Sequence, residues 1–164
     1  MNSPFEKIVI DKKEERKFRR RALRQFPKEY MQVMYGFIEN GVAYVCIFLD
    51  IKHTATSQAC SYWHSDLDAH MDEAKRHNLV CLGTIHSHPD RDHTLFSEGD
   101  LEDSQSTQEV IMGICAIESL GKGKKRRRCH VAYWPTTRPI DVVYKDWDAQ
   151  QFAKSNRRPR VTPA

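Results

Sequence analysis

Residues 83–100, GTIHSHPDRDHTLFSEGD, contain side-chain types that bind metal ions, at spacings that can bring them together. His86 and His88 close a strand-like run, and residues i and i+2 of a strand point to the same face. Their backbone positions would lie about 6.6 Å apart, so both rings can converge on one ion at about 2.0–2.1 Å. With a carboxylate and an open position for water, two imidazoles make the ligand set of a hydrolytic zinc site. Two histidines on a strand are also common surface residues, so the pair alone does not establish a site.

The loop after the histidines supplies the third candidate ligand. Pro89 favours an extended conformation at His88, which keeps both rings on the strand side of the turn. Ser97 and Asp100 form an S-x-x-D pattern, a variant of the capping box, which predicts a helix from Glu98. An aspartate in the first turn of that helix can point back at the strand end, so capping and metal binding are compatible.

A catalytic zinc site also needs a general base that is not a ligand. Composition offers several glutamates, and spacing alone does not choose among them. They are Glu29, Glu39, Glu98, Glu109 and Glu118.

The elements that must position these residues follow from periodicity and turn signals. Asn40-Gly41 between two β-rich runs is a strong hairpin signal, and Pro27 ends an amphipathic helical pattern. The predicted helices are 12–26, 65–77 with Ser65 as N-cap, and one from Glu98. The predicted strands are 5–10, 30–39, 42–51, 78–88, 110–117, 128–134 and 140–147. This order lacks the regular βαβ rhythm and predicts the α/β class of α+β type, a mixed, mostly antiparallel β-sheet flanked by helices.

Length and composition limit the remaining choices. The 164 residues suit one domain over 1–150, followed by a basic tail over 151–164. Five scattered cysteines without a C-x-x-C pair argue for buried thiols in a reducing cytoplasm. The longest apolar run, 42–49, is too short to span a bilayer, and the first residues lack an apolar signal segment. Neither glycine-rich phosphate-binding pattern, GxGxxG or GxxxxGK[ST], is present.

The net charge of +4 is concentrated in three basic clusters, residues 12–24, 122–128 and 154–160. Such runs are usually solvated faces, and they can also attract an acidic protein partner. Aromatic interleaving and recognised nucleic-acid motifs are lacking, which makes nucleic acid an unfavoured partner.

The segments HSHP and SEGD resemble the JAMM motif, also called MPN+ or JAB, of zinc isopeptidases. In that family a glutamate precedes the H-x-H, within a stretch like P-x-E-x-x-G-x-L-x-G. Here PKEYMQVMYG matches at Pro27, Glu29, Met34 and Gly36. The resemblance, carried by these two segments within residues 26–134, is strongest to single-domain prokaryotic or phage members.

The resemblance implies a JAB/MPN-like fold and assigns roles. Zn²⁺ would be held by His86, His88 and Asp100, with Glu29 as general base and Ser97 assisting the oxyanion. The implied substrate is a peptide or isopeptide bond after the flexible C-terminal tail of a ubiquitin-like or other protein. The alternative is a non-catalytic scaffold of this fold that binds protein or nucleic acid. A zinc deaminase would need H-x-E and P-C-x-x-C, and both are absent.

Two features depart from the family pattern. Gln32 stands where a small glycine is usual. The loop from Pro89 to Phe96 separates His88 from Ser97 by eight residues, one more than is usual. His93 in this loop could reach the metal or the substrate, although an exposed loop histidine is the more ordinary interpretation. Both departures bear on substrate specificity, since every expected ligand is retained.

Overall fold

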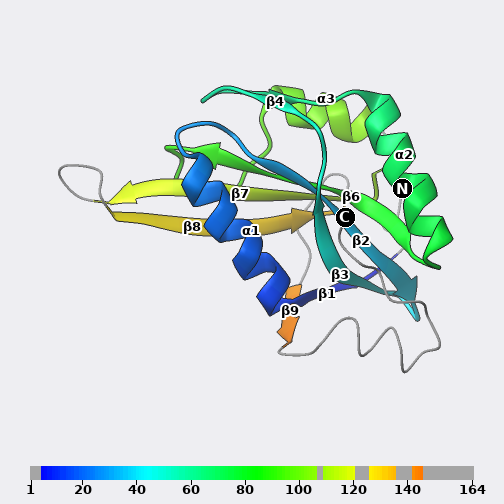
Figure 1. The fold of residues 1–164 in the computed structure, drawn as a ribbon. Coiled ribbons are helices and arrows are strands. Elements are labelled where there is room, and N and C mark those ends of the chain that lie inside the picture. Colours follow the sequence, from blue (N-terminus) through cyan, green and yellow to red (C-terminus); the bar gives the residue numbers. More distant parts are fainter. Residues whose placement is uncertain (1–4, 107–108, 121–125, 136–141, 146–164) are drawn as a thin grey trace.

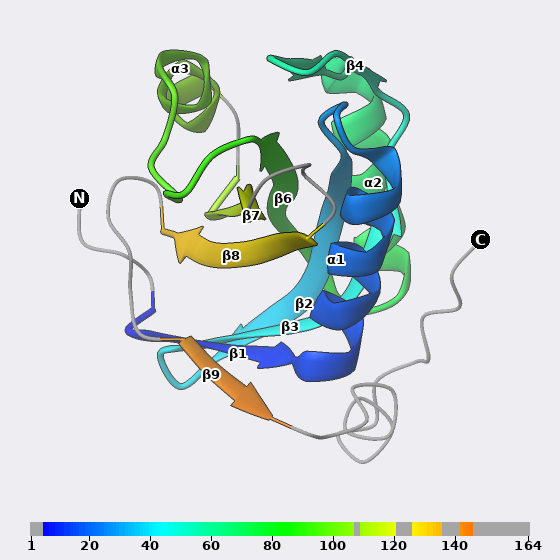
Figure 2. The ribbon, with the colours of Figure 1, turned by 90° about the vertical axis from the view of Figure 1, so that its left-hand side faces the viewer.

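The computed structural model describes residues 5–106, 109–120, 126–135 and 142–145. A seven-stranded mixed sheet with strand order β8-β7-β6-β2-β3-β1-β9 curls through the molecule (Figures 1 and 2). The helices are α1 (Lys12–Gln25), α2 (His64–Arg76) and α3 (Glu98–Ser106). The strands of this sheet are β1 (Lys7–Asp11), β2 (Met31–Glu39), β3 (Val42–Asp50), β6 (Val80–Pro89), β7 (Ile111–Leu120), β8 (Arg126–Trp134) and β9 (Val142–Lys145).

The hairpin of β2 and β3 forms the centre of the sheet. Asn40 and Gly41 turn the chain with φ values of 51° and 73°, the positive values that a two-residue hairpin turn requires. Residues 31–37 of β2 are all buried, because one face packs on α1 and the other on α2. The predicted hairpin is confirmed.

Parallel pairs flank this antiparallel centre. β1 pairs in parallel with β3 and β9, and β6 pairs in parallel with β7, although most paired residues lie in antiparallel pairs. The chain passes from β6 through α3 to β7, so α3 is the crossover that a parallel pair needs. The predicted fold class, a mixed and mostly antiparallel sheet flanked by helices, is confirmed.

The two longer helices cover opposite faces of the sheet. Phe18 and Ala22 of α1 are fully buried in one apolar cluster, and Leu67 and Ala74 of α2 are buried in the other. The periodic apolar positions seen in the sequence therefore mark the packed faces.

The start of α2 differs from the prediction. Ser65 was expected as the N-cap, but the helix begins at His64 and its N-cap is Trp63, without a side-chain cap bond. The carbonyl of Trp63 accepts from the N–H groups of Asp66 at 2.9 Å and Leu67 at 3.4 Å. The first turn thus closes two residues earlier, which leaves the Ser65 hydroxyl inside the turn, where it cannot cap.

One glycine allows β6 to approach β7 closely. Gly83 has φ +151°, and a Cβ atom there would lie 1.8 Å from the carbonyl oxygen of Ile111. The β2–β6 register shifts beside it, where Met34 pairs with Gly83 and Tyr35 with Cys81. This bulge sets the register in which the rest of β6 reaches the site.

A second small sheet was not predicted. It consists of β4 (Thr54–Ala55) and β5 (Cys60–Ser61), which pair antiparallel. Among the residues described, no helix combines the length and apolar character needed to cross a bilayer. Residues 122–125 of the second basic cluster and the tail 151–164 lie outside the described residues.

Candidate metal centre

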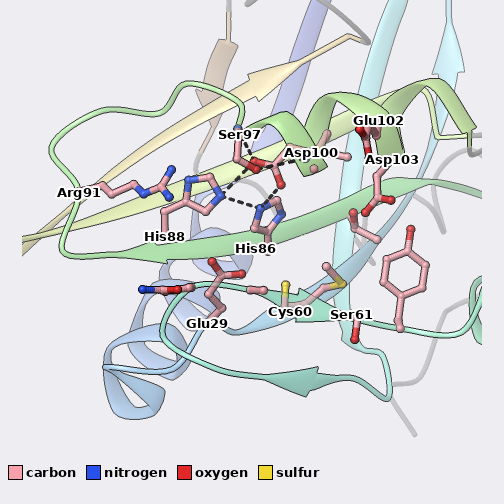
Figure 3. Close-up of a pocket in the computed structure, with 17 residues that line it drawn as sticks. Glu29, Cys60, Ser61, His86, His88, Arg91, Ser97, Asp100, Glu102 and Asp103 are labelled. Atoms are coloured by element: carbon pink, nitrogen blue, oxygen red, sulfur yellow. Dashed lines mark hydrogen bonds and ion pairs between the residues drawn. The ribbon is translucent and has the colours of Figure 1, made fainter.

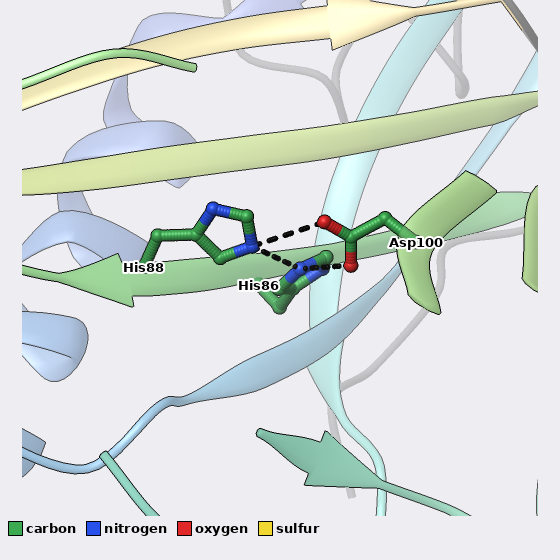
Figure 4. A group of neighbouring side chains, drawn as sticks. All are labelled: His86, His88 and Asp100. Carbon is green, nitrogen blue, oxygen red and sulfur yellow. Dashed lines mark hydrogen bonds and ion pairs between the residues drawn. The ribbon is translucent and has the colours of Figure 1, made fainter. Parts of the chain in front are cut away.

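His86 and His88 lie near the C-terminal end of β6, on the same face of the strand. Both are buried, with exposed fractions of 3% and 2%, and their Nε2 atoms are 2.8 Å apart (Figure 4). The apolar residues Leu82 and Ile85, which precede them, are fully buried in the core. The packed strand therefore fixes the direction of both imidazoles, as the two-residue spacing predicted.

Asp100, in the first turn of α3, faces the two rings. Its Oδ1 lies 2.9 Å from Nε2 of His86, and its Oδ2 lies 3.2 Å from Nε2 of His88. The same Oδ2 accepts the backbone N–H of Ser97 at 2.8 Å, while the Asp100 N–H donates to Ser97 Oγ at 3.2 Å. The predicted reciprocal cap is confirmed, and it holds the carboxylate in place.

Contacts within this group shift the pKa values of His86 and Asp100. Burial lowers the pKa of His86, but the hydrogen bond and negative charge of Asp100 outweigh burial and raise it. Burial raises the pKa of Asp100, but its bonds to His86 and His88 outweigh burial and hold it well below its usual range. Asp100 is therefore a carboxylate at neutral pH, the form that binds a cation.

The arrangement fits a divalent metal ion. One ligand atom from each of the three residues lies within 4.8 Å of the others. Zinc in tetrahedral coordination separates its ligand atoms by about 3.3 Å, so the observed 2.8–3.2 Å needs only a small opening. Two imidazole nitrogens this close, both directed at a carboxylate, are an arrangement that a shared cation would stabilise. Both Nδ1 atoms are buried without a hydrogen-bond partner among the described atoms.

His86, His88 and Asp100 line a cavity with a volume of about 400 Å³ (Figure 3). Glu29 lines the same cavity. It is buried, at 6% exposed, and lies across the cavity from the histidines. The Tyr30 N–H donates to Ser87 Oγ and the Ser87 N–H donates to the Tyr30 carbonyl, both at 2.9 Å. These two bonds tie the chain beside Glu29 to the strand between the two histidines.

Hairpin β4–β5 forms the wall of the cavity on the Glu29 side, facing the two histidines (Figure 3). The Glu29 N–H donates to the carbonyl of Thr56, in the turn of this hairpin, at 2.8 Å. This bond joins the hairpin to the backbone at Glu29. Burial and the neighbouring Glu29 carboxylate raise the pKa of Cys60 above its ordinary value, so its thiol stays protonated. Tyr62 and Asp103 also line the cavity, and burial raises the pKa of each.

The other candidate glutamates, all among the described residues, do not line this cavity. The carboxylate of Glu109 accepts the Thr84 N–H at 2.7 Å, and Glu118 lies 2.8 Å from Nε2 of His130. His93 is exposed and also lies outside the cavity lining. Sequence reasoning missed Arg91, Cys60, Tyr62, Glu102 and Asp103, which line the cavity from segments that carry no motif.

Gln32, the departure from the family pattern, is 2% exposed on β2. Its amide donates to Tyr30 Oη at 3.1 Å and to Asp50 Oδ1 at 3.0 Å. Asp50 also pairs with Arg21 at 3.2 Å. The larger side chain thus belongs to a polar network with Tyr30 and Asp50, and it does not line the cavity.

Comparison with known proteins identifies the family and the fold of this chain. The model of a family described as prokaryotic homologs of the JAB domain matches residues 11–130. The solution structure of protein DSY2949 from Desulfitobacterium hafniense is similar, with a TM-score of 0.61 and 16% sequence identity. The match covers 85% of this chain and 94% of that one, a likeness of fold. No curated protein matches. The family match covers most of the chain, from the start of α1 to β8, and shows that the chain belongs to the prokaryotic homologs of the JAB domain.

Proposed function

We propose that this protein is a zinc-dependent hydrolase of JAMM type. The substrate would be a peptide or isopeptide bond that follows the C-terminal tail of a ubiquitin-like or other protein. One observation carries the proposal: two buried imidazoles and a carboxylate face one another, and a buried glutamate lines the same cavity. The five free thiols fit a reducing cytoplasm, which we propose as the location.

His86, His88 and Asp100 would hold the ion. When bound, zinc supplies a Lewis acid that polarises a carbonyl and lowers the pKa of a water to about 7. Glu29 would take the proton of the attacking water and pass it to the leaving amine. The position of Glu29 across the cavity from His86, His88 and Asp100 supports this role (Figure 3).

Ser97 would assist as a hydrogen-bond donor to the oxyanion, a contribution of about 3 kcal/mol in comparable sites. Ser97 lines the cavity just before α3, and its Oγ accepts the Asp100 N–H, so its own O–H is available to donate. The cap therefore orients the serine that this mechanism needs.

The test changes only the proton-transfer group. We expect Glu29→Gln to retain about one zinc per chain and to lose hydrolysis by a factor of 10²–10⁴, since general acid–base catalysis contributes on that order. Glu102→Gln is the control, because Glu102 lines the same cavity but is exposed. Zinc is measured by elemental analysis, and hydrolysis on a panel of ubiquitin-like proteins fused to reporters.

Turnover by Glu29→Gln at the wild-type rate would remove Glu29 as the base. Zinc-loaded wild-type protein that cleaves no member of the panel, while binding some of them, would favour the non-catalytic scaffold instead.

A further inference from the structure

The exposed side of α1 is almost entirely basic. The only acidic residues of α1 are Glu14 and Glu15, in its first turn. Glu15 is buried and accepts from Tyr133, while Glu14 is half-buried and pairs with Lys17. The exposed basic residues of the helix are Lys12, Lys13, Arg16, Lys17, Arg20, Arg21 and Arg24.

A contact joins this helix to the first residues of β8. The guanidinium carbon of Arg127 lies 4.0 Å from the ring centroid of Phe26, the C-cap residue of α1. Side chains alternate along a strand, so Arg126 and Arg128 point away from α1. We call Arg16, Arg20, Arg24, Lys28 and Arg127, all exposed, the basic face.

The basic face leads to the candidate metal centre. Exposed Lys28 directly precedes Glu29, which lines the cavity. Arg91 also lines it, on the His88 side in Figure 3, and its N–H donates to the Ile117 carbonyl of β7 at 3.2 Å. Ile117 pairs with Cys129 of β8, two residues from Arg127. Basic side chains thus occur on the outer helix, at the start of β8 and on one side of the cavity, with the Asp90 carboxylate accepting from Ser119, the residue paired with Arg127, at 2.9 Å.

The far side of the cavity has the opposite charge. Glu102 and Asp103 line it beyond Asp100 (Figure 3). A substrate segment with several carboxylates would be repelled there and attracted on the Arg91 side. The two sides therefore define a direction along which an acidic segment can lie.

We propose that an acidic segment of the substrate protein docks on the basic face, next to the bond that is cleaved. This inference rests on the proposed function, and its basis is charge complementarity, which steers encounter and fixes orientation. Single-stranded nucleic acid is usually bound with exposed aromatic rings. On α1, Phe18 is buried, and the ring of Phe26 is covered by Arg127.

The first experiment measures binding without turnover. The probes are a labelled peptide of ten glutamates, a Gly/Ser peptide of the same length, and a short DNA duplex. We expect Arg20→Glu/Arg24→Glu to bind the acidic peptide on the order of tenfold more weakly at low salt, with the difference vanishing near 0.5 M salt, since charge on the rim is screened. Lys7→Glu/Lys75→Glu, which has the same charge change at exposed positions elsewhere, is expected to stay near wild type.

The milder Arg20→Gln/Arg24→Gln variant is expected to fall between wild type and the charge reversal. An equal loss in the Lys7/Lys75 control, or duplex binding without peptide binding, would overturn the proposal. So would wild-type protein that binds the acidic peptide no better than the Gly/Ser peptide.

The second experiment uses two fusion substrates with one cleavage site, only one of which carries an acidic segment. We expect the Arg20/Arg24 reversal to raise KM for the acidic fusion at constant kcat and to leave the neutral fusion unchanged. Equal effects on both fusions would refute docking on the basic face, but the proposed hydrolase activity would remain supported. Wild-type protein that cleaves neither fusion would refute the proposed hydrolase, and the binding experiment would still decide whether the basic face takes acidic segments.

Discussion

Asp100 joins two tasks at a single carboxylate. Its oxygens cap the first turn of its own helix and face both imidazoles. The S-x-x-D spacing predicted the cap by local geometry alone, because a capping box involves only neighbours in sequence. The orientation of the carboxylate toward the histidines depends on how α3 crosses the end of β6, which only the folded chain shows.

Glu29 illustrates the limit of residue-level reasoning. Nothing in the spacing of the five candidate glutamates distinguished it, and only the family resemblance selected it. The structure places Glu29 in the cavity through the two bonds between Tyr30 and Ser87, which join residues far apart in sequence. Such long-range pairing leaves no local signal.

Asp50 carries a prediction about pH. Burial raises its pKa, but hydrogen bonds from Tyr30 and Gln32 and the charge of Arg21 outweigh burial and lower it. A carboxylate with a lowered pKa stabilises the fold above its unfolded pKa of about 3.9, and the contribution is lost as pH falls through the folded value.

We therefore expect Asp50→Asn to reduce the free energy of unfolding by about 1 kcal/mol at pH 6, a modest amount because solvent screens the site. The difference from wild type should shrink as pH falls below about 4, because the unfolded chain then binds a proton at Asp50 more readily than the folded chain does. Urea unfolding between pH 3 and 7 measures it, with Asp68→Asn, at an exposed position on α2, as control. A difference that stays constant over this range would contradict the assigned role of Asp50.

At the scale of elements, the sequence predicted most helices and strands but not how all the strands pair. The central hairpin was predictable because its turn needs two residues that tolerate positive φ, and Asn40-Gly41 supplies them. Parallel pairing of β6 with β7 was not, because its register depends on a crossover through α3. Hairpin β4–β5 escaped prediction because its strands have two residues each, too few for a periodic pattern.

Gly83 carries a prediction about β6. A methyl group there would clash with the Ile111 carbonyl, so we expect Gly83→Ala to lower the free energy of unfolding by about 2–4 kcal/mol. Gly99→Ala is the matched control, since the nearest atom to its added Cβ would be Ser97 Oγ at 3.9 Å. Alanine in that helix should be neutral or stabilising by up to about 1 kcal/mol. Chemical denaturation measures the stability of both variants. Equal stability of Gly83→Ala and Gly99→Ala would mean that β7 can move away from the added methyl group without loss of stability.

At the scale of the whole molecule, the proposed ion would connect β6 to α3. A ligand that binds only the folded state stabilises it by about 2.7 kcal/mol at 100 times its Kd. We expect zinc to raise the melting temperature of wild-type protein and of His93→Ala, whose exposed ring lies outside the cavity lining. His88→Ala should show no such rise, because one of the three ligands is gone.

Thermal melts with and without a chelator, together with bound-zinc analysis, measure this effect. A full zinc-dependent rise in His88→Ala would exclude His88 from the metal centre.

Hairpin β4–β5 has a consequence for how such a protein can change over evolution. The three candidate metal ligands lie on the packed sheet and on a capped helix, whereas this wall is a pair of two-residue strands, and the Thr56 carbonyl in its turn accepts the Glu29 N–H. Insertions or replacements between Ile51 and Tyr62 would change what enters the cavity and leave His86, His88 and Asp100, which lie on other elements, in place. The entrance to the cavity and the candidate metal centre would then evolve as separate parts of the molecule.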